Sequence, residues 1–204
     1  MIIIKSQREI DLMREPCKVT KEILEDLDAV IRPGISTEDI NAFVEGRIAH
    51  YNMKPTFKGY GGFTAGACVS VNEEIVHGIP SAKRILQEGD IVSIDTGAMF
   101  KGYTSDAART YAVGEISAEA QKLIDVTKES FFRGIEYAKA GYRLGDLGHA
   151  IQEYSEANGM GVIRSYTGHG VGRNLHEDPM VPNYGTPGKG VKLKAGMTLA
   201  IEPM

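Results

Sequence analysis

Residues 93–110 read SIDTGAMFKGYTSDAART, and this stretch decides how the middle of the chain folds. Small and β-branched residues lie on both sides of a central Lys-Gly pair, which indicates a hairpin turn between two antiparallel strands. A turn at that pair sets Asp106 opposite Gly97, diagonal to Asp95 and on the same face of the sheet. Side chains in that relation have Cβ atoms roughly 7–8 Å apart or less. The two carboxylates can therefore hold one or two cations between them.

The composition is that of one ordinary globular domain, with 204 residues, of which 42% are hydrophobic and 25% charged. A net charge of −4 without any cluster of Lys and Arg predicts no direct nucleic-acid partner and no membrane partner. Cys17 and Cys68 are too sparse for a disulfide framework and indicate a reducing cytoplasm. The first residues become charged at Lys5, before the apolar core of a signal peptide could be completed.

The order of expected elements is helix, helix, strands, and then the same again. Ser6 and Glu9 match the capping-box pattern at the start of the first predicted helix. Helices are predicted over residues 6–34, 36–52, 117–141 and 143–159, and strands within 66–80, 90–100, 103–114, 161–168 and 197–204.

An internal repeat accounts for this order. At an offset of 107, Gly34 falls on Gly141, Asp39 on Asp146 and Asp95 on Glu202. The repeat predicts an α+β fold of two pseudo-symmetric halves, about residues 1–113 and 114–204, around a central antiparallel sheet in one catalytic domain.

The repeat also makes an expectation about the end of the sequence. The strand that carries Asp95 turns back and returns with Asp106, whereas only two residues follow Glu202. We therefore expect the second half to be incomplete, truncated at its C-terminal end inside an element, with a sheet edge left open.

Histidine and glutamate supply further candidate metal ligands. Asp95 directly follows the apolar run IVSI, where a metal ion would offset the cost of burying its charge. His169 lies between glycines in SYTGHGVGRNLHEDP (165–179), and Glu202 is the repeat mate of Asp95. Asp95, Asp106, His169 and Glu202 form an oxygen-rich set suited to Mn²⁺, Fe²⁺, Co²⁺ or Zn²⁺. Two such ions would activate a shared water, which predicts metal-assisted hydrolysis.

Other residues are candidates for substrate contact. His176, seven residues after His169, is a substrate-contacting candidate, and His77 could donate to a substrate amide or assist proton transfer. Tyr60, Phe63 and Cys68 lie in an aromatic, Gly-rich segment that could line an apolar pocket. The plainer alternatives are solvated strand aspartates, structural histidines and ordinary core packing.

Four motifs together resemble the methionine aminopeptidase family, in its short, bacterial-like type I form. They are VNEEIVHGIP (71–80), SIDTGAMFKGYTSD (93–106), TGHGVGRNLHEDP (167–179) and AIEPM (200–204), in family order and spacing. The resemblance implies the pita-bread fold, two divalent metal ions (Co, Mn, Fe or Zn), and removal of the initiator methionine from nascent proteins with a small second residue. It also implies nascent polypeptide N-termini as partners, met at the ribosome, and a monomer.

The resemblance assigns a role to each candidate residue. Asp95 would chelate one ion, Asp106 would bridge both, and His169 with Glu202 would hold the other, with Glu202 also a candidate general base. His77 and His176 would be catalytic residues that contact the scissile peptide and stabilise the intermediate. Tyr60, Phe63 and Cys68 would accept the methionine side chain. The family's fifth ligand, a bridging Glu, has no counterpart in the sequence, so we expect impaired activity relative to a form extended at its C-terminal end.

Several competing interpretations stay open. Proline-specific aminopeptidases and prolidases share the implied fold and ligands, and usually carry an additional N-terminal domain. Over the length of this sequence, the type II methionine aminopeptidases differ from the type I form only in local sequence. A pita-bread protein that has become a non-catalytic binding module is a different class, although such relatives typically lose the ligands. A fragment of an ordinary enzyme is the simplest account of the ending.

Overall fold

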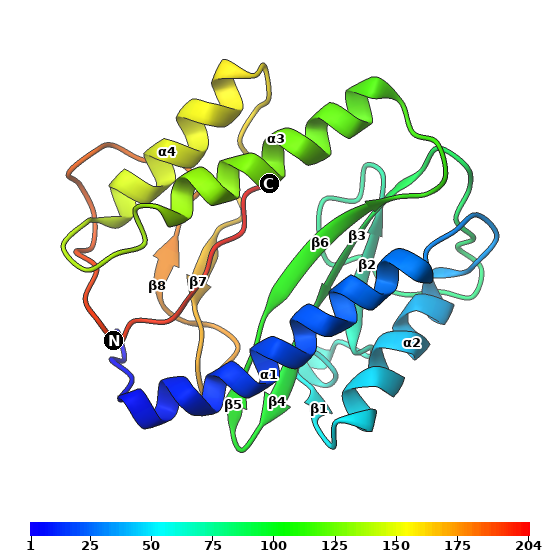
Figure 1. Ribbon diagram of the computed structural model, residues 1–204, viewed down its shortest axis with the longest axis horizontal. Helices are drawn as coiled ribbons and strands as arrows, with labels where there is room; N and C mark the ends of the chain where they lie inside the picture. Colours follow the sequence, from blue (N-terminus) through cyan, green and yellow to red (C-terminus); the bar gives the residue numbers. More distant parts are fainter. The chain divides into compact units, whose positions relative to one another are not determined.

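The structure, a computed structural model, describes all residues 1–204 and divides into two compact units. The N-terminal unit is Asp11–Gln121, and the C-terminal unit combines Met1–Ile10 with Lys122–Met204. Figure 1 shows the elements of each unit coloured along the chain. None of the helices combines the length and the apolar composition that a membrane-spanning segment requires.

Two helices open the chain. Helix α1 (Gln7–Asp26) continues into a 3-10 turn at Leu27–Ala29, and helix α2 (Thr37–His50) follows. The predicted capping box is present, because the Ser6 N–H donates to Glu9 Oε2 at 2.9 Å and the Glu9 N–H donates to Ser6 Oγ at 3.4 Å. Pro16 is accommodated inside α1, where it is buried.

The N-terminal unit holds two antiparallel sheets of three strands each. One has the order β1 (Lys54–Pro55), β4 (Ala98–Phe100), β5 (Tyr103–Thr104), and the other β2 (Ala67–Val71), β3 (Ile91–Thr96), β6 (Ala107–Ala112). A 3-10 turn at Tyr60–Gly62 precedes β2. Apolar faces of α1 and α2 pack on one face of β2 and β3, through the side chains of Ile23, Leu27, Ile40, Val44, Ile48, Val69, Val92 and Ile94.

Burial alternates strictly along β3. Val92, Ile94 and Thr96 are buried, and the residues between them are only half-buried. Because successive side chains of a strand point to opposite faces, Asp95 lies on the face turned away from this core. The sheet thereby supplies the core with one face and presents the carboxylate on the other.

The C-terminal unit has the same order of element types. Helices α3 (Ala118–Ile135, whose first turn belongs to the N-terminal unit) and α4 (Leu144–Ala157) precede an antiparallel sheet. Its order is β8 (Glu177–Val181), β7 (Gly168–Gly170), β9 (Leu199–Ala200). Its core consists of Leu144, Leu147, Ile151, Val181 and Leu193. The α+β organisation with antiparallel sheets is as predicted.

Several local predictions are wrong. The first helix, predicted to extend to residue 34, ends as an α-helix at Asp26 and as a 3-10 turn at Ala29. The stretch 161–167 is irregular, and only Gly168 of the strand predicted over 161–168 is in a strand. Helix α3 ends at Ile135, short of the predicted end at 141. Strand β8 was not predicted, since its sequence EDPMV is polar and contains a proline. Pairing with β7 decides its conformation, and that contact is invisible in a local pattern.

We expect Ser36→Ala to destabilise the N-terminal unit. The Ser36 hydroxyl accepts from the Asp39 N–H at 3.1 Å and donates to Asp39 Oδ2 at 2.7 Å, and Ser36 is buried, with 5% of the residue exposed. Loss of such an N-cap lowers the free energy of unfolding by about 1–2 kcal/mol. Urea unfolding followed by circular dichroism measures the effect. Ser6→Ala is the control, because the Ser6 cap of α1 is exposed and its hydrogen bond from the Glu9 N–H is longer, at 3.4 Å, so its removal should lower the free energy of unfolding by less. An unchanged urea midpoint for Ser36→Ala would contradict the expectation.

Candidate active site

The hairpin that carries the two aspartates has one continuous register. Thr96 pairs with Ala107 in β3 and β6, and Met99 pairs with Thr104 in β4 and β5, so Gly97 and Asp106 fall opposite each other between these pairs. The tip residues have positive φ angles, 48° at Lys101 and 80° at Gly102, as in the mirror-image turns that suit twisted hairpins. The predicted turn and register are thus both present.

Two features hold this hairpin in place. A side chain at Gly97 would meet the Ser105 carbonyl oxygen at 2.1 Å, so only glycine permits this close approach of the strands. Ser105 Oγ accepts from the Ala98 N–H at 2.9 Å and lies 2.7 Å from Thr20 Oγ1 on α1, in a buried hydroxyl pair. The segment next to Asp106 is therefore tied to the helix as well as to its partner strand.

Cys68 lies directly opposite Asp95, on the neighbouring strand β2. Burial, followed by the charges of Asp95 and then Asp106, raises the pKa of the Cys68 thiol to about 12. The pKa of Cys17 on α1 is also raised, first by burial of its thiol and then by Asp106. Both thiols are free, and Cys68 stays neutral at physiological pH. The structure therefore brings Asp95, Asp106 and Cys68 together within the N-terminal unit.

The other residues predicted to contact substrate in this unit lie in loops. Tyr60 is 47% exposed and Phe63 is half-buried, and the Phe63 N–H donates to the Tyr60 carbonyl at 2.9 Å. His77 is exposed and has a φ of 62°, a conformation that a residue with a side chain seldom adopts. The following Gly78 lies against β2, since its carbonyl accepts from the Val69 N–H at 2.9 Å. The loop thus presents the His77 side chain to solvent beside the sheet.

In the C-terminal unit, the glycines on either side of His169 lie against neighbouring strands. A side chain at Gly168 would meet the Ala200 carbonyl oxygen at 2.3 Å, and one at Gly170 would meet the Asp178 carbonyl oxygen at 2.2 Å. The two glycines therefore let the backbones of β9 and β8 approach β7 closely. His169 is fixed between two strands and is only 8% exposed.

The hydrogen bonds of His169 define its tautomer. Its Nδ1 lies 2.8 Å from the Gly170 carbonyl oxygen, which can only accept, so Nδ1 carries the proton. Nε2 faces Glu202 Oε1 at 3.3 Å. A lone pair and a carboxylate oxygen repel each other at that distance unless a proton or a metal ion lies between them. A metal ion fits here, since ligating histidines commonly donate their other ring N–H to a carbonyl.

Two neighbours complete this part of the site. The His176 ring lies 4.1 Å from the His169 ring, centroid to centroid, and His176 is exposed. Asn183, fully buried, donates from Nδ2 to the Glu202 carbonyl at 2.6 Å and so fixes the backbone behind the carboxylate. His169, His176 and Glu202 are therefore together within the C-terminal unit.

Sequence reasoning missed one feature of this region. Lys5 and Glu177 form an ion pair at 2.5 Å in which each side chain is 3% exposed. The available signals were Lys5, which ends an apolar run, and Glu177, which lies beside His176. Nothing in the sequence shows that these two residues, 172 positions apart, are in contact.

Residues 11–204 match the sequence pattern of Metallopeptidase family M24, so the chain belongs to that family of hydrolases. Metallopeptidases use divalent metal ions, and three carboxylates with one imidazole are a donor set that such ions accept. The family assignment spans both compact units.

Within this family the protein is similar over its whole length to methionine aminopeptidases. It is 58% identical to the Clostridium acetobutylicum methionine aminopeptidase, over 100% of this sequence and 82% of that protein. The Thermotoga maritima methionine aminopeptidase structure has a TM-score of 0.97 at 50% identity, over 100% of this sequence and 82% of the other. The Pyrococcus furiosus prolidase has a TM-score of 0.84 at 28% identity, over 98% of this sequence and 57% of the other. These matches confirm the pita-bread fold and favour the methionine aminopeptidases over the prolidases.

The raised pKa of Cys68 predicts a slow reaction with alkylating agents. At pH 8 a thiol with a pKa of about 12 has almost no thiolate, so iodoacetamide should modify Cys68 at least about 100-fold more slowly than an ordinary cysteine. Mass spectrometry of the Cys17→Ser variant, in which Cys68 is the remaining thiol, measures this rate. Free cysteine under the same conditions is the control, and a rate for Cys68 equal to that of free cysteine would contradict the assignment.

Proposed function

We propose that this protein removes the N-terminal initiator methionine from proteins whose second residue is small. The observation that carries the proposal is the similarity to methionine aminopeptidases, which extends over every residue of the sequence. The geometry within each unit supports it, because the candidate ligands and substrate residues cluster in both. We also propose that the two units form one catalytic domain, since a single family pattern spans both.

The proposed metal ligands are Asp95, Asp106, His169 and Glu202, for two ions of Co, Mn, Fe or Zn. The hairpin register, with Asp106 opposite Gly97, supports the first pair, and the 3.3 Å approach of His169 Nε2 to Glu202 supports the second. When bound, the ions would polarise the scissile carbonyl and lower the pKa of the attacking water. Glu202 would accept a proton from that water as general base.

The proposed side-chain pocket of Tyr60, Phe63 and Cys68 suits an unbranched, apolar thioether. Two aromatic rings make favourable contacts with sulfur, and a neutral thiol adds no charge to the pocket. Burial is the largest cause of the raised pKa of this thiol, and in the metal-free protein the charges of Asp95 and Asp106 add to it.

The proposed roles of His77 and His176 are to contact the scissile peptide and stabilise the charge of the tetrahedral intermediate. Both side chains are exposed, as groups that meet a substrate must be. His77 is held by its loop in a left-handed conformation, and His176 lies against the His169 ring. We further propose that the protein acts as a monomer in the cytoplasm on nascent N-termini at the ribosome. Its free cysteines are in keeping with a reducing compartment.

Peptide cleavage tests the proposed specificity. With Mn²⁺, the protein should release methionine from Met-Ala-Ser at least about 10-fold faster than from Met-Leu-Ser, because a large second side chain would not fit. It should leave Ala-Pro intact. Chromatography of the products measures all three reactions, and the Asp106→Asn variant controls for contaminating peptidases. Faster hydrolysis of Ala-Pro than of Met-Ala-Ser would favour a proline-specific enzyme, and no hydrolysis with no bound metal would favour a binding module.

Loss of a proposed ligand should weaken metal binding. Asp106→Asn and Glu202→Gln remove a charged donor without changing its size, so the dissociation constant for Mn²⁺ should rise at least about 10- to 100-fold. Isothermal titration calorimetry of the metal-free protein measures this constant. Asp28→Asn is the matched control, because Asp28 pairs with Arg109 in an exposed contact of the same unit and should leave Mn²⁺ binding unchanged. Equal affinity in all three variants would exclude the assignment.

A further inference from the structure

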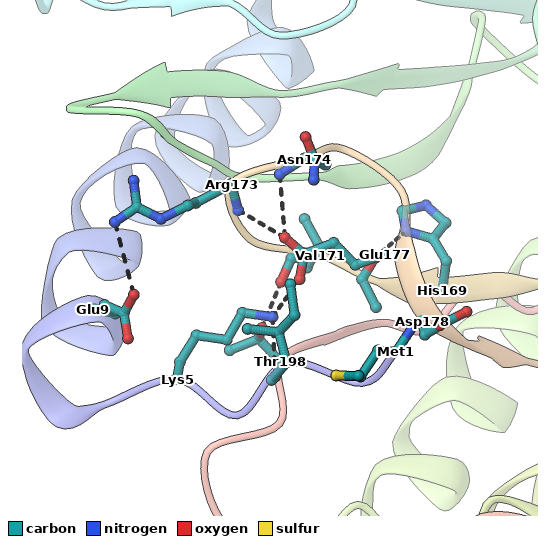
Figure 2. A network of polar contacts seen from close by, with 12 residues as sticks. Met1, Lys5, Glu9, His169, Val171, Arg173, Asn174, Glu177, Asp178 and Thr198 are labelled. Atoms are coloured by element: carbon teal, nitrogen blue, oxygen red, sulfur yellow. Dashed lines mark hydrogen bonds and ion pairs between the residues drawn. The ribbon is translucent and has the colours of Figure 1, made fainter.

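A buried ion pair between Lys5 and Glu177 joins the first residues of the chain to the turn 173–177 (Figure 2). Lys5 Nζ lies 2.5 Å from Glu177 Oε2, and both side chains are buried, with only 3% of each exposed. Glu177 directly follows His176 in the sequence. The ion pair therefore acts on the backbone immediately next to a proposed catalytic side chain.

The other oxygen of Glu177 closes this turn. Oε1 accepts from the Arg173 N–H at 2.9 Å and from the Asn174 N–H at 3.2 Å. The Gly172 N–H in turn donates to the Asn174 carbonyl at 3.0 Å. One carboxylate thus holds both ends of the segment 173–177 together and joins that segment to Lys5 (Figure 2).

The surroundings leave this pair little freedom. A side chain at Gly172 would lie 2.6 Å from Lys5 Cε and 2.8 Å from Glu177 Oε1, so the glycine makes room for both partners. The Lys5 backbone N–H donates to the Gly196 carbonyl at 2.8 Å, which fixes the base of the lysine. The Val171 N–H donates to the Thr198 carbonyl at 3.2 Å. The stretch 196–198 therefore holds both the backbone of Lys5 and the residues just before the turn.

Two other ionic contacts join the same segments at the surface. Arg173 lies 3.8 Å from Glu9, and the Met1 ammonium group contacts Asp178 (Figure 2). Exposed pairs of this kind contribute little, because water screens them and long side chains lose entropy. The buried pair is the anchor among the three contacts.

A buried ion pair is seldom the most stable solution for a protein interior, since apolar residues of similar volume do as well or better. What it supplies is a single arrangement, because neither charge can move away from the other without being left unpaired in a dry environment. At this place a single arrangement matters, as the adjacent His176 ring must keep its position 4.1 Å from His169.

We propose that Lys5 is a positioning residue for His176, acting through the Glu177 carboxylate on the turn 173–177. This inference rests on the proposed function, because His176 has a catalytic role only if the protein is an aminopeptidase. Lys5 itself holds neither metal nor substrate. Its effect is on how often the turn holds the His176 side chain in the reactive position.

The test compares Lys5→Met, the double variant Lys5→Met with Glu177→Gln, and Lys5→Arg with the parent, all loaded with Mn²⁺. In the double variant, the Glu177→Gln amide oxygen can still accept from the Arg173 and Asn174 N–H groups, and no carboxylate charge is left buried without its lysine. The double variant therefore stays informative if Lys5→Met alone folds poorly. Lys18→Met, which removes an exposed lysine paired with Glu15 on α1, is the matched control.

For both variants that lack Lys5, kcat on Met-Ala-Ser should fall roughly 10- to 100-fold with KM changed less than about 3-fold. Lys5→Arg keeps the positive charge and should retain more activity than Lys5→Met. Amide hydrogen exchange should accelerate about 10-fold in residues 171–178 and remain unchanged in α2. Lys18→Met should resemble the parent in both measurements.

A parental kcat together with parental exchange of residues 171–178 in the double variant would overturn the proposal. Equal acceleration of exchange in all segments would also overturn it, because the pair would then serve general stability. If the parent itself does not cleave Met-Ala-Ser, the proposed function fails on its own. The exchange of residues 171–178 then still decides whether Lys5 fixes this turn.

Discussion

The register of the β3–β6 hairpin is the constraint on which the N-terminal unit depends. With Thr96 opposite Ala107, Val92 and Ile94 face the helices while Asp95 faces away from them. A slip of one residue would exchange the two faces, burying the carboxylate and exposing the core. The same hydrogen bonds that complete the core therefore place the acidic residues on the opposite face, so folding and site formation are one event here.

The C-terminal unit reaches a comparable result by close approach of strands. Glycines on both sides of His169 let β8 and β9 come within contact of the backbone of β7, and the Gly170 carbonyl then selects the ring tautomer. Nε2 is left facing Glu202. Backbone packing thereby sets the chemical state of a side chain, which is why glycine is needed at positions that touch no ligand.

Burial has three different outcomes for the ionisable groups of this protein. Cys68 stays neutral, because burial and neighbouring carboxylates raise its pKa. Lys5 and Glu177 are joined to each other in a buried ion pair. The proposed ligands Asp95 and Glu202 would keep their charge by binding cations. Each outcome avoids leaving an unpaired charge in a buried place. The neutral thiol belongs to the proposed apolar pocket, the ion pair to the turn beside His176, and the carboxylates to the proposed metal site.

The sequence by itself determined the presence of the four helices, the capping box of the first, the hairpin turn and the identity of the candidate ligands, because these follow from local periodicity and from residue chemistry. It also determined the family resemblance that the comparisons confirm. Only the tertiary structure decided that EDPMV forms a strand, why glycines flank His169, and that Lys5 meets Glu177. Those features depend on contacts between residues distant in the sequence, and a local pattern carries no information about which distant backbone or charge will be its neighbour.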